Sequence, residues 1–320
     1  CRAESPLAFF TIIKAAMTAP VQIPTQQIRL PETESAGISL FVRREDLLHP
    51  VISGNKYRKL KYNLLRAKEE GHTTLLTFGG AFSNHIAATF RAGSEYGYRT
   101  IGVIRGEELE SRPKNPTLVA ALRDGMQLKF VSRQAYGQKA DAAFVEALKA
   151  ELGPFYLLPE GGTNRLAVRG CEEILAESDR QFTHICCCVG TGGTLAGLIN
   201  ASVERQRLIG FQVLKGDYLT KDIRSFVRKD NWYLEDGYHF GGYAKINQSL
   251  VTFINNFRRD TGILVDPVYT GKMFYGIAHM ARRGLFEPGT RILAIHSGGL
   301  QGIAGMNQFL SQKKLPLINL

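Results

Sequence analysis

The chain has 320 residues, 44% of them hydrophobic, and 33 glycines, a composition typical of a globular protein long enough for two domains. Its formal net charge of +11 arises from 40 scattered lysines and arginines, with no basic run interleaved with aromatic residues. This distribution argues against a nucleic-acid partner and is typical of an enzyme whose site attracts anionic ligands.

The cysteines indicate a reducing compartment. Cys186, Cys187 and Cys188 are consecutive in an apolar run, so they cannot form an ordinary set of disulfides, and no cysteine pair has CxxC metal spacing. We interpret the triplet as small buried residues of a strand in a cytoplasmic protein without a metal site. The apolar stretch 7–13 is too short to span a membrane, so we expect no membrane partner. We interpret it as an extension upstream of a natural start at Met17 rather than as a signal peptide.

Strands and helices are predicted to alternate along the chain. A loop at 23–30 leads to a strand at 38–42, and the helix that begins at Lys56 carries Leu60, Leu64 and Leu65 at helical spacing. Further strands are expected at 73–78, 100–104, 128–131, 184–189 and 291–296, and one that ends near Asp266. Further helices are expected from Ile86, at 116–122, 140–152 and 168–176, from Leu195 and at 273–283. The stretch 215–256 has no readable pattern.

This alternation predicts an α/β protein with parallel, doubly wound sheets. Residues 60–159 form a compact unit by themselves, and the glycine-rich crossing at 160–164 returns the chain to a second unit. We therefore expect a small domain at 60–159 and a discontinuous large domain made of 1–59 and 160–320.

Lys56 stands where a Ser-Gly turn passes into a helix. A lysine there is less solvated than a surface lysine and lies near the partial positive charge of the helix N-terminus. Both effects favour the neutral amine, which can form an imine with an aldehyde. The alternative is an ordinary solvated lysine.

A glycine-rich turn follows the strand at 184–189, at Gly190-Thr191-Gly192-Gly193-Thr194. Its backbone N–H groups and two hydroxyls, at a helix N-terminus, fit a phosphate. Leu195 replaces the third glycine of the dinucleotide fingerprint, and no Gly-Lys-Ser/Thr completes a Walker motif. The alternative is a plain glycine turn.

Polar side chains mark other strand ends. Ser83, Asn84 and His85 begin a helix and could hold a carboxylate or a phenolic oxygen, although Ser83 could simply cap the helix and His85 could be structural. Tyr269 could stack on a flat ring or move a proton, and Thr270 could bond a ring nitrogen. The carboxyl ends of strands in open α/β sheets face the ligand crevice.

Pyridoxal 5'-phosphate requires four features that these candidates would supply together: a lysine that forms an imine, a phosphate-binding turn, a helix start that binds a carboxylate, and a partner for the ring nitrogen. The chain also resembles the fold-type-II pyridoxal-phosphate enzymes, and within them the D-cysteine desulfhydrase and 1-aminocyclopropane-1-carboxylate deaminase family. The resemblance runs from about residue 28 to 305. Its carriers are Gly54-Asn55-Lys56-Tyr57-Arg58-Lys59-Leu60, Gly79-Gly80-Ala81-Phe82-Ser83-Asn84-His85, Gly190-Thr191-Gly192-Gly193-Thr194, Asp266-Pro267-Val268-Tyr269-Thr270-Gly271-Lys272 and His296-Ser297-Gly298-Gly299.

The resemblance implies a two-domain tryptophan-synthase-β-like fold, in which the large domain binds the cofactor and the small domain the substrate. By position, Lys56 would hold the cofactor and move the substrate Cα proton, with Ser83 and Tyr269 as further catalytic residues. The cofactor would also contact Asn84, the residues Gly190, Thr191, Gly192, Gly193 and Thr194, and Thr270 and Ser297. The substrate would contact Ser83, Asn84, His85 and Tyr269. A cytoplasmic homodimer acting in amino-acid metabolism is the family expectation.

Two positions separate the activities of the family. The deaminases have Glu where this chain has Thr270, and Leu at the position of Ser297, whereas the desulfhydrases have Thr at the Ser297 position. We therefore expect a lyase that converts D-cysteine and water to pyruvate, ammonia and sulfide. The alternatives are a ring-opening deaminase, a pyridoxal-phosphate-binding protein with little turnover, and an adenine-nucleotide binder that uses the turn at Gly190.

Overall fold

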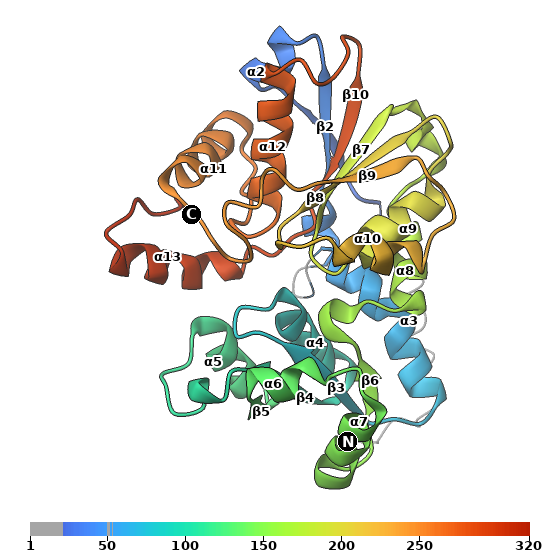
Figure 1. Cartoon of the computed structure of the whole chain (residues 1–320), viewed down its shortest axis with the longest axis vertical. Coiled ribbons are helices and arrows are strands. Elements are labelled where there is room, and N and C mark those ends of the chain that lie inside the picture. Colours follow the sequence, from blue (N-terminus) through green and yellow to red (C-terminus); the bar gives the residue numbers. More distant parts are fainter. Residues whose placement is uncertain (1–21, 50–51, 53) are drawn as a thin grey trace, which may run out of the picture.

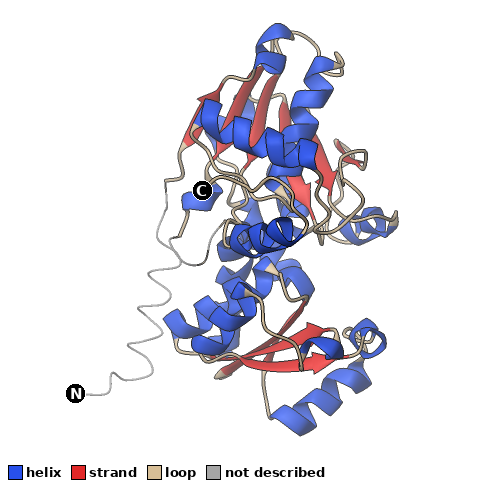
Figure 2. Cartoon of the chain, turned by 90° about the vertical axis from the view of Figure 1, so that its left-hand side faces the viewer, coloured by secondary structure: helices blue, strands red, loops and turns tan. Residues whose placement is uncertain are grey.

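The computed structural model describes residues 22–49, 52 and 54–320, which form two sheets flanked by helices (Figure 1). The expectations for the apolar stretch 7–13 and for Met17 lie outside these residues. Helices cover both faces of each sheet (Figure 2), which confirms the α/β class with mostly parallel sheets. No helix in the described part of the chain is long and apolar enough to cross a membrane.

The larger sheet has six strands in the order β1-β2-β10-β7-β8-β9, and only β1 runs antiparallel to its neighbour. The strands are β1 (Thr25–Ile28), β2 (Ser39–Arg43), β7 (His184–Val189), β8 (Arg207–Gln212), β9 (Trp232–Glu235) and β10 (Arg291–Ile295). One face packs on α2 (Pro31–Ser35), α11 (Gln248–Thr261), α12 (Thr270–Arg282) and α13 (Gly302–Gln312). The other packs on α8 (Arg165–Glu172), α9 (Gly193–Ala201) and α10 (Tyr218–Arg224). The cysteine triplet lies in β7 and is buried, as predicted.

The smaller sheet has the order β5-β4-β3-β6 and is parallel throughout. Its strands are β3 (Thr74–Gly79), β4 (Arg99–Arg105), β5 (Gln127–Val131) and β6 (Tyr156–Leu158). The helices around it are α4 (Asn84–Tyr96), α5 (Pro116–Arg123), α6 (Arg133–Gly137) and α7 (Ala142–Leu152). The domain boundaries at residues 59 and 159 remain a prediction; the first falls inside α3 (Asn55–Glu69), and the second follows β6.

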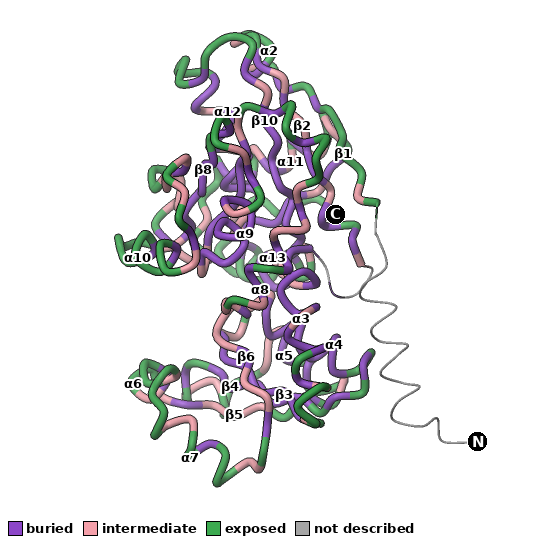
Figure 3. The backbone as a smooth tube through the Cα atoms, turned by 90° about the vertical axis from the view of Figure 1, so that its right-hand side faces the viewer, coloured by how far each residue is buried: buried purple, intermediate pink, exposed green. Residues whose placement is uncertain are grey.

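Helix α3 joins the two sheets and packs along α8, and both helices are largely buried (Figure 3). The contact is close because a Cβ on Gly170 would lie 2.0 Å from the carbonyl oxygen of Arg58. Charged side chains of α3 are paired on two sides: Arg58 donates to both carboxylate oxygens of Glu45, which precedes α3, at 3.0 and 3.1 Å, and Lys61 lies 2.7 Å from Glu173 at the end of α8. The first turn of α3, which carries Lys56, is therefore held from both sides.

Two predicted segments differ from the structure. The loop expected at 23–30 contains β1, whose pairing with β2 the short polar sequence did not reveal. The strand expected before Tyr269 was wrong, because residues 263–266 have no regular structure. Pro267 has no N–H to donate to a ladder. The carboxylate of Asp266 instead accepts the N–H groups of residues 268, 269 and 270 at 2.9, 3.0 and 2.7 Å and so caps α12. The unreadable stretch 215–256 contains α10, β9 and the start of α11.

We expect Gly170→Ala to lower the free energy of unfolding by about 1–3 kcal/mol, because the added methyl group forces α8 away from the backbone of α3. Urea unfolding monitored by circular dichroism measures the change. Gly137→Ala is the matched control, since a Cβ on Gly137 meets no heavy atom within 4 Å. Equal stabilities of the Gly170→Ala variant and the parent would contradict close packing at this junction.

Candidate active site

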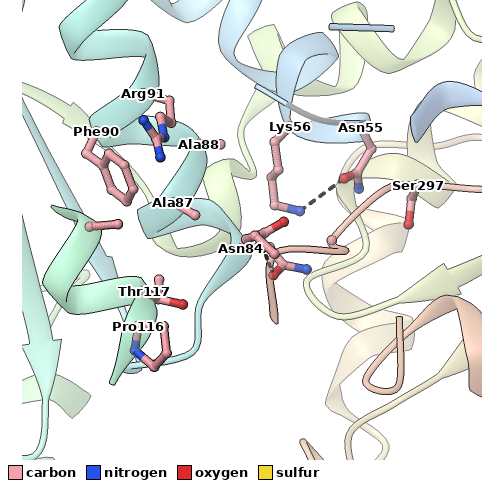
Figure 4. Close-up of a pocket in the computed structure, with 13 residues that line it drawn as sticks. Asn55, Lys56, Asn84, Ala87, Ala88, Phe90, Arg91, Pro116, Thr117 and Ser297 are labelled. Atoms are coloured by element: carbon pink, nitrogen blue, oxygen red, sulfur yellow. Dashed lines mark hydrogen bonds between the residues drawn. The ribbon is translucent and has the colours of Figure 1, made fainter. Parts of the chain in front are cut away.

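Two adjoining cavities lie where the carboxyl ends of β3, β7 and β10 meet the start of α3. The larger has a volume of about 360 Å³ (Figure 4) and the smaller of about 60 Å³. Asn55, Lys56, Asn84 and Ser297 line both cavities. Parallel strands direct their following loops to one edge of a sheet, which is why residues far apart in sequence meet here.

Lys56 lies in the first turn of α3, and a close backbone contact fixes that turn. Gly54 has φ +66°, and a Cβ there would lie 1.9 Å from the carbonyl oxygen of Ser297, so only glycine fits. The N–H of Asn55 donates to the same oxygen at 3.3 Å, which ties α3 to the end of β10. The Lys56 amine donates to Oδ1 of Asn55 at 3.2 Å, and Nδ2 of Asn55 donates to Thr194 at 2.7 Å. Burial lowers the pKa of Lys56, which favours the neutral nucleophilic amine.

The turn at residues 190–194 joins β7 to α9 and lines the smaller cavity together with Lys56. Gly192 adopts φ +80°, and a Cβ on Gly193 would lie 2.9 Å from Thr163, so a side chain at either position would deform the turn. Gly190, Thr191, Gly192 and Thr194 line the smaller cavity. Backbone N–H groups and hydroxyls thus surround a small concave space at a helix N-terminus, which suits a phosphate.

Lys59 is a site residue that our sequence analysis missed. It lines the smaller cavity and is only 2% exposed, and its amine donates to the Gly161 carbonyl and to Thr163 Oγ1, each at 2.9 Å. Burial, together with the nearby charge of Lys56, lowers the pKa of Lys59 to about 7. Its spacing was a usable signal, since residues three apart on a helix share a face.

The start of α4 brings Ser83, Asn84 and His85 to the cavities. Ser83 caps the helix, because its Oγ accepts the N–H groups of His85 at 3.2 Å and Ile86 at 3.3 Å. Oδ1 of Asn84 accepts a hydrogen bond from Gln301 at 2.6 Å, so the amide is oriented by the loop between β10 and α13. His85 is 1% exposed, and neither ring nitrogen has a partner among the described residues. Burial lowers its pKa well below the usual value, as do Lys56 and Lys59 to a smaller extent, so the imidazole is neutral.

Tyr269 lies against the glycine turn, since a Cβ on Gly190 would be 3.2 Å from its ring. The ring of Tyr243 meets it edge-on, with the centroids 6.2 Å apart. Burial is the main cause that raises the pKa of Tyr269, and neighbouring Tyr243 adds to it, so the phenol keeps its proton. Tyr243 is a second residue that we did not predict, because the stretch around it had no clear pattern.

Ser297 and Thr270 are placed differently. Ser297 lines both cavities, and its hydroxyl lies 3.1 Å from the Cys188 thiol. Thr270 is fully buried and lines neither cavity. Its hydroxyl donates to Oδ1 of Asp266 at 2.8 Å and accepts the Asp266 N–H at 2.9 Å, so both of its hydrogen bonds are used within the loop. Of the other predicted site residues, only Gly193 is absent from the two linings.

The donors present fit pyridoxal 5'-phosphate. The glycine turn and Lys59 can take the phosphate, Lys56 can take the aldehyde, and the Asn84 amide lies beside Lys56 for a ring oxygen (Figure 4). Among the described lining residues none is Asp or Glu, whereas Lys56, Lys59 and Arg91 are basic. Such a site favours anionic groups. The described residues contain no cluster of His, Cys, Asp and Glu that could hold a metal ion.

Two relatives are similar to this chain over most of their length. A protein from Pyrococcus horikoshii named putative 1-aminocyclopropane-1-carboxylate deaminase is 33% identical over 308 residues, which cover 88% of this chain and 91% of the relative. The bifunctional D-cysteine desulfhydrase/1-aminocyclopropane-1-carboxylate deaminase of Arabidopsis thaliana mitochondria is 28% identical over 322 residues, covering 89% of this chain and 78% of the relative.

Solved structures agree with the fold. The crystal structure of an ACC deaminase homologue matches with a TM-score of 0.78 and 30% identity, covering 93% of this chain and 98% of that structure. An O-acetylserine-dependent cystathionine β-synthase from Helicobacter pylori matches with a TM-score of 0.64 and 14% identity, covering 89% and 94%, which supports the fold alone. These neighbours confirm the tryptophan-synthase-β-like architecture implied by the resemblance.

The family model described as pyridoxal-phosphate dependent enzyme matches residues 18–298. The cofactor is therefore pyridoxal 5'-phosphate rather than an adenine nucleotide. The family match, the named relatives and the donors that line the cavities all support this. The chain therefore belongs to the pyridoxal-phosphate-dependent enzymes, and its relatives are the 1-aminocyclopropane-1-carboxylate deaminases and D-cysteine desulfhydrases.

Proposed function

We propose that this enzyme eliminates a thiol from the β-carbon of a small D-amino acid, with D-cysteine as the simplest substrate and pyruvate, ammonia and sulfide as products. The observation that carries the proposal is the absence of any Asp or Glu from the described residues that line the two cavities. Without a carboxylate at the ring nitrogen, the cofactor is a weaker electron sink. That favours substrates with a good leaving group, such as a thiolate, over cleavage of a carbon–carbon bond in a ring.

In this proposal Ser297 is the neutral partner of the ring nitrogen. Its hydroxyl lines both cavities, whereas the Thr270 hydroxyl is fully hydrogen-bonded to Asp266. Thr270 then acts indirectly, by fixing the loop that carries Tyr269. Burial raises the pKa of Asp266, and hydrogen bonds from the Thr270 hydroxyl and three backbone N–H groups reduce that rise without removing it.

When bound, pyridoxal phosphate supplies an electron-withdrawing ring that weakens the Cα–H bond of an amino acid. Lys56 would hold the cofactor through its amine, and the same amine, whose lowered pKa suits it to the task, would accept the Cα proton. The N–H groups at the start of α4, together with Ser83 and Asn84, bind the substrate carboxylate. Tyr269 keeps its proton and can donate it to the departing sulfur. Gly190 to Thr194 and Lys59 bind the phosphate.

Ring-opening deamination is the second candidate, because several relatives are named putative 1-aminocyclopropane-1-carboxylate deaminases. The same amine and the same carboxylate site would serve that reaction. It would need a stronger electron sink than the hydroxyl of Ser297 provides.

A homodimer and a cytoplasmic location, both implied by the resemblance, belong to the proposal, and light scattering of the purified protein tests the first.

We expect D-cysteine to give pyruvate with a kcat/KM at least about tenfold above that for 2-oxobutanoate formation from 1-aminocyclopropane-1-carboxylate, a difference of about 1.4 kcal/mol in barrier. L-cysteine should give little pyruvate. Product assays by liquid chromatography measure both reactions, and Lys56→Ala should abolish both. A higher kcat/KM for the cyclopropane substrate would replace the proposal with the deaminase.

The role of Lys59 predicts a pH dependence of phosphate binding. Below pH 7 its amine is charged before the ligand arrives, and above its pKa of about 7 binding must include uptake of a proton. We expect the Kd of the cofactor-free protein for pyridoxine 5'-phosphate, which has no aldehyde for Lys56, to rise severalfold between pH 7 and 8.5. Calorimetry measures this Kd.

Lys59→Met should bind pyridoxine 5'-phosphate more weakly at pH 7 and lose most of this pH dependence. Lys149→Met, which removes a partly exposed lysine that pairs with Glu146 on α7, should behave like the parent. If Lys59→Met kept both the affinity and the pH dependence of the parent, Lys59 would not contact the phosphate.

A further inference from the structure

The larger cavity extends beyond the atoms that a reaction of D-cysteine would use. From Lys56 and Asn84 it continues along one face of α4, past Ala87 and Ala88 to Arg91 (Figure 4). Positions 84, 87, 88 and 91 share that face because they follow the helical repeat. Pro116, Thr117 and Ala120 of α5 form the opposite wall. We call this part of the cavity the α4–α5 arm.

The arm is too long for cysteine. Asn84 and Arg91 are seven residues apart on a helix, a rise of about 10 Å. The side chain of cysteine has one carbon and one sulfur, so it ends near the polar end of the cavity and leaves the arm empty. A cavity of about 360 Å³ has room for a longer group attached to that sulfur.

The walls change in character along the arm. The end near Lys56 is polar, with Asn55, Asn84, Ser297 and Gln301. The middle is apolar, because alanines on α4 and α5 and the ring of Phe90 line it. The far end has a positive charge, the guanidinium of Arg91. This order matches a ligand with an amino-acid head, a short aliphatic middle and an anionic tail.

Arg91 retains donors for such a tail. Its Nη1 donates to Oδ2 of Asp124 at 2.5 Å, and its guanidinium lies 5.0 Å from the ring centroid of Phe90. Its other four N–H groups have no acceptor among the described residues. Asp124 also accepts from Nε of Arg123 at 3.1 Å, so this carboxylate keeps a cationic partner if Arg91 turns toward a ligand. A carboxylate is the anion that an arginine fork binds in two parallel hydrogen bonds.

We propose that the α4–α5 arm binds the leaving group of S-substituted cysteines whose substituent ends in a carboxylate, and that Arg91 selects that carboxylate. This inference rests on the proposed elimination reaction and extends it to a class of thioether substrates. The tail lies along the alanines of α4, and the sulfur lies near Lys56.

The reaction balances with water as the co-reactant. The Cα–H and Cβ–S bonds break, the sulfur leaves as a thiol after taking up a proton, and hydrolysis of the three-carbon fragment releases pyruvate and ammonium. One R–S–CH2–CH(NH3+)–COO− and one water give R–SH, CH3–CO–COO− and NH4+. No oxidant or reductant is needed.

The test compares S-(2-carboxyethyl)-D-cysteine with its amide, S-(2-carbamoylethyl)-D-cysteine, which has nearly the same shape without the charge. For the holoenzyme we expect kcat/KM for the acid to exceed that for the amide by about tenfold or more. Titration of the visible absorbance should give a lower apparent Kd for the acid by a similar factor. Pyruvate release measures turnover.

Arg91→Gln should bring the acid-to-amide ratio close to one, and Arg91→Lys should retain part of it. Arg123→Gln is the matched control: it removes the other arginine that pairs with Asp124 but does not line the cavity, and it should keep the parent ratio. A ratio near one in the parent enzyme, or an unchanged ratio in Arg91→Gln, would overturn the inference. If D-cysteine still yields pyruvate in that case, the proposed function stands; if none of the three compounds does, the proposed function itself has failed.

Discussion

The site depends on two lysine amines buried close together in a place where no described lining residue has a carboxylate. Lys56 and Lys59 lie three residues apart on the first turns of α3, and burial lowers the pKa of both. The charge of Lys56 also makes Lys59 harder to protonate, a repulsion that accounts for part of the lowered pKa of Lys59. Two such amines can be buried together only if one of them stays neutral or if a bound anion compensates their charge. A phosphorylated aldehyde meets both conditions, since the aldehyde consumes one amine and the phosphate neutralises the other.

The architecture supplies this pair by bringing strand ends together. The end of β10 holds Gly54 and Asn55 through the Ser297 carbonyl, the end of β7 carries the glycine turn, and β3 leads to the start of α4. The strand ends of the large sheet and the start of α3 thus supply most of the residues around the smaller cavity, while α4 and α5 supply most of those around the larger cavity. Differences in substrate choice between relatives can therefore arise on α4 and α5 without a change at Lys56.

The sequence predicted the parallel sheets and most of the residues that line the smaller cavity, because both depend on local patterns. Strands of alternating or apolar residues, each followed by glycines and a helix, are readable one segment at a time. Thr270 shows the limit: its position in the motif suggested a ring-nitrogen partner, but the structure has its hydroxyl bonded to Asp266. Tyr243 and the α4–α5 arm depend on contacts between segments far apart in the chain, which spacing alone does not reveal. Lys59 could have been found from its position three residues after Lys56 on the same helix.

The central claim is that Lys56, rather than Lys59, carries the cofactor. Reduction of the purified enzyme with borohydride makes that bond permanent, and peptide mass spectrometry then locates it. We expect a reduced phosphopyridoxyl group on Lys56 and an unmodified Lys59. The assignment to Lys56 would be wrong if the group were found on Lys59 or on another lysine. It would also be wrong if no lysine were modified after incubation with pyridoxal phosphate.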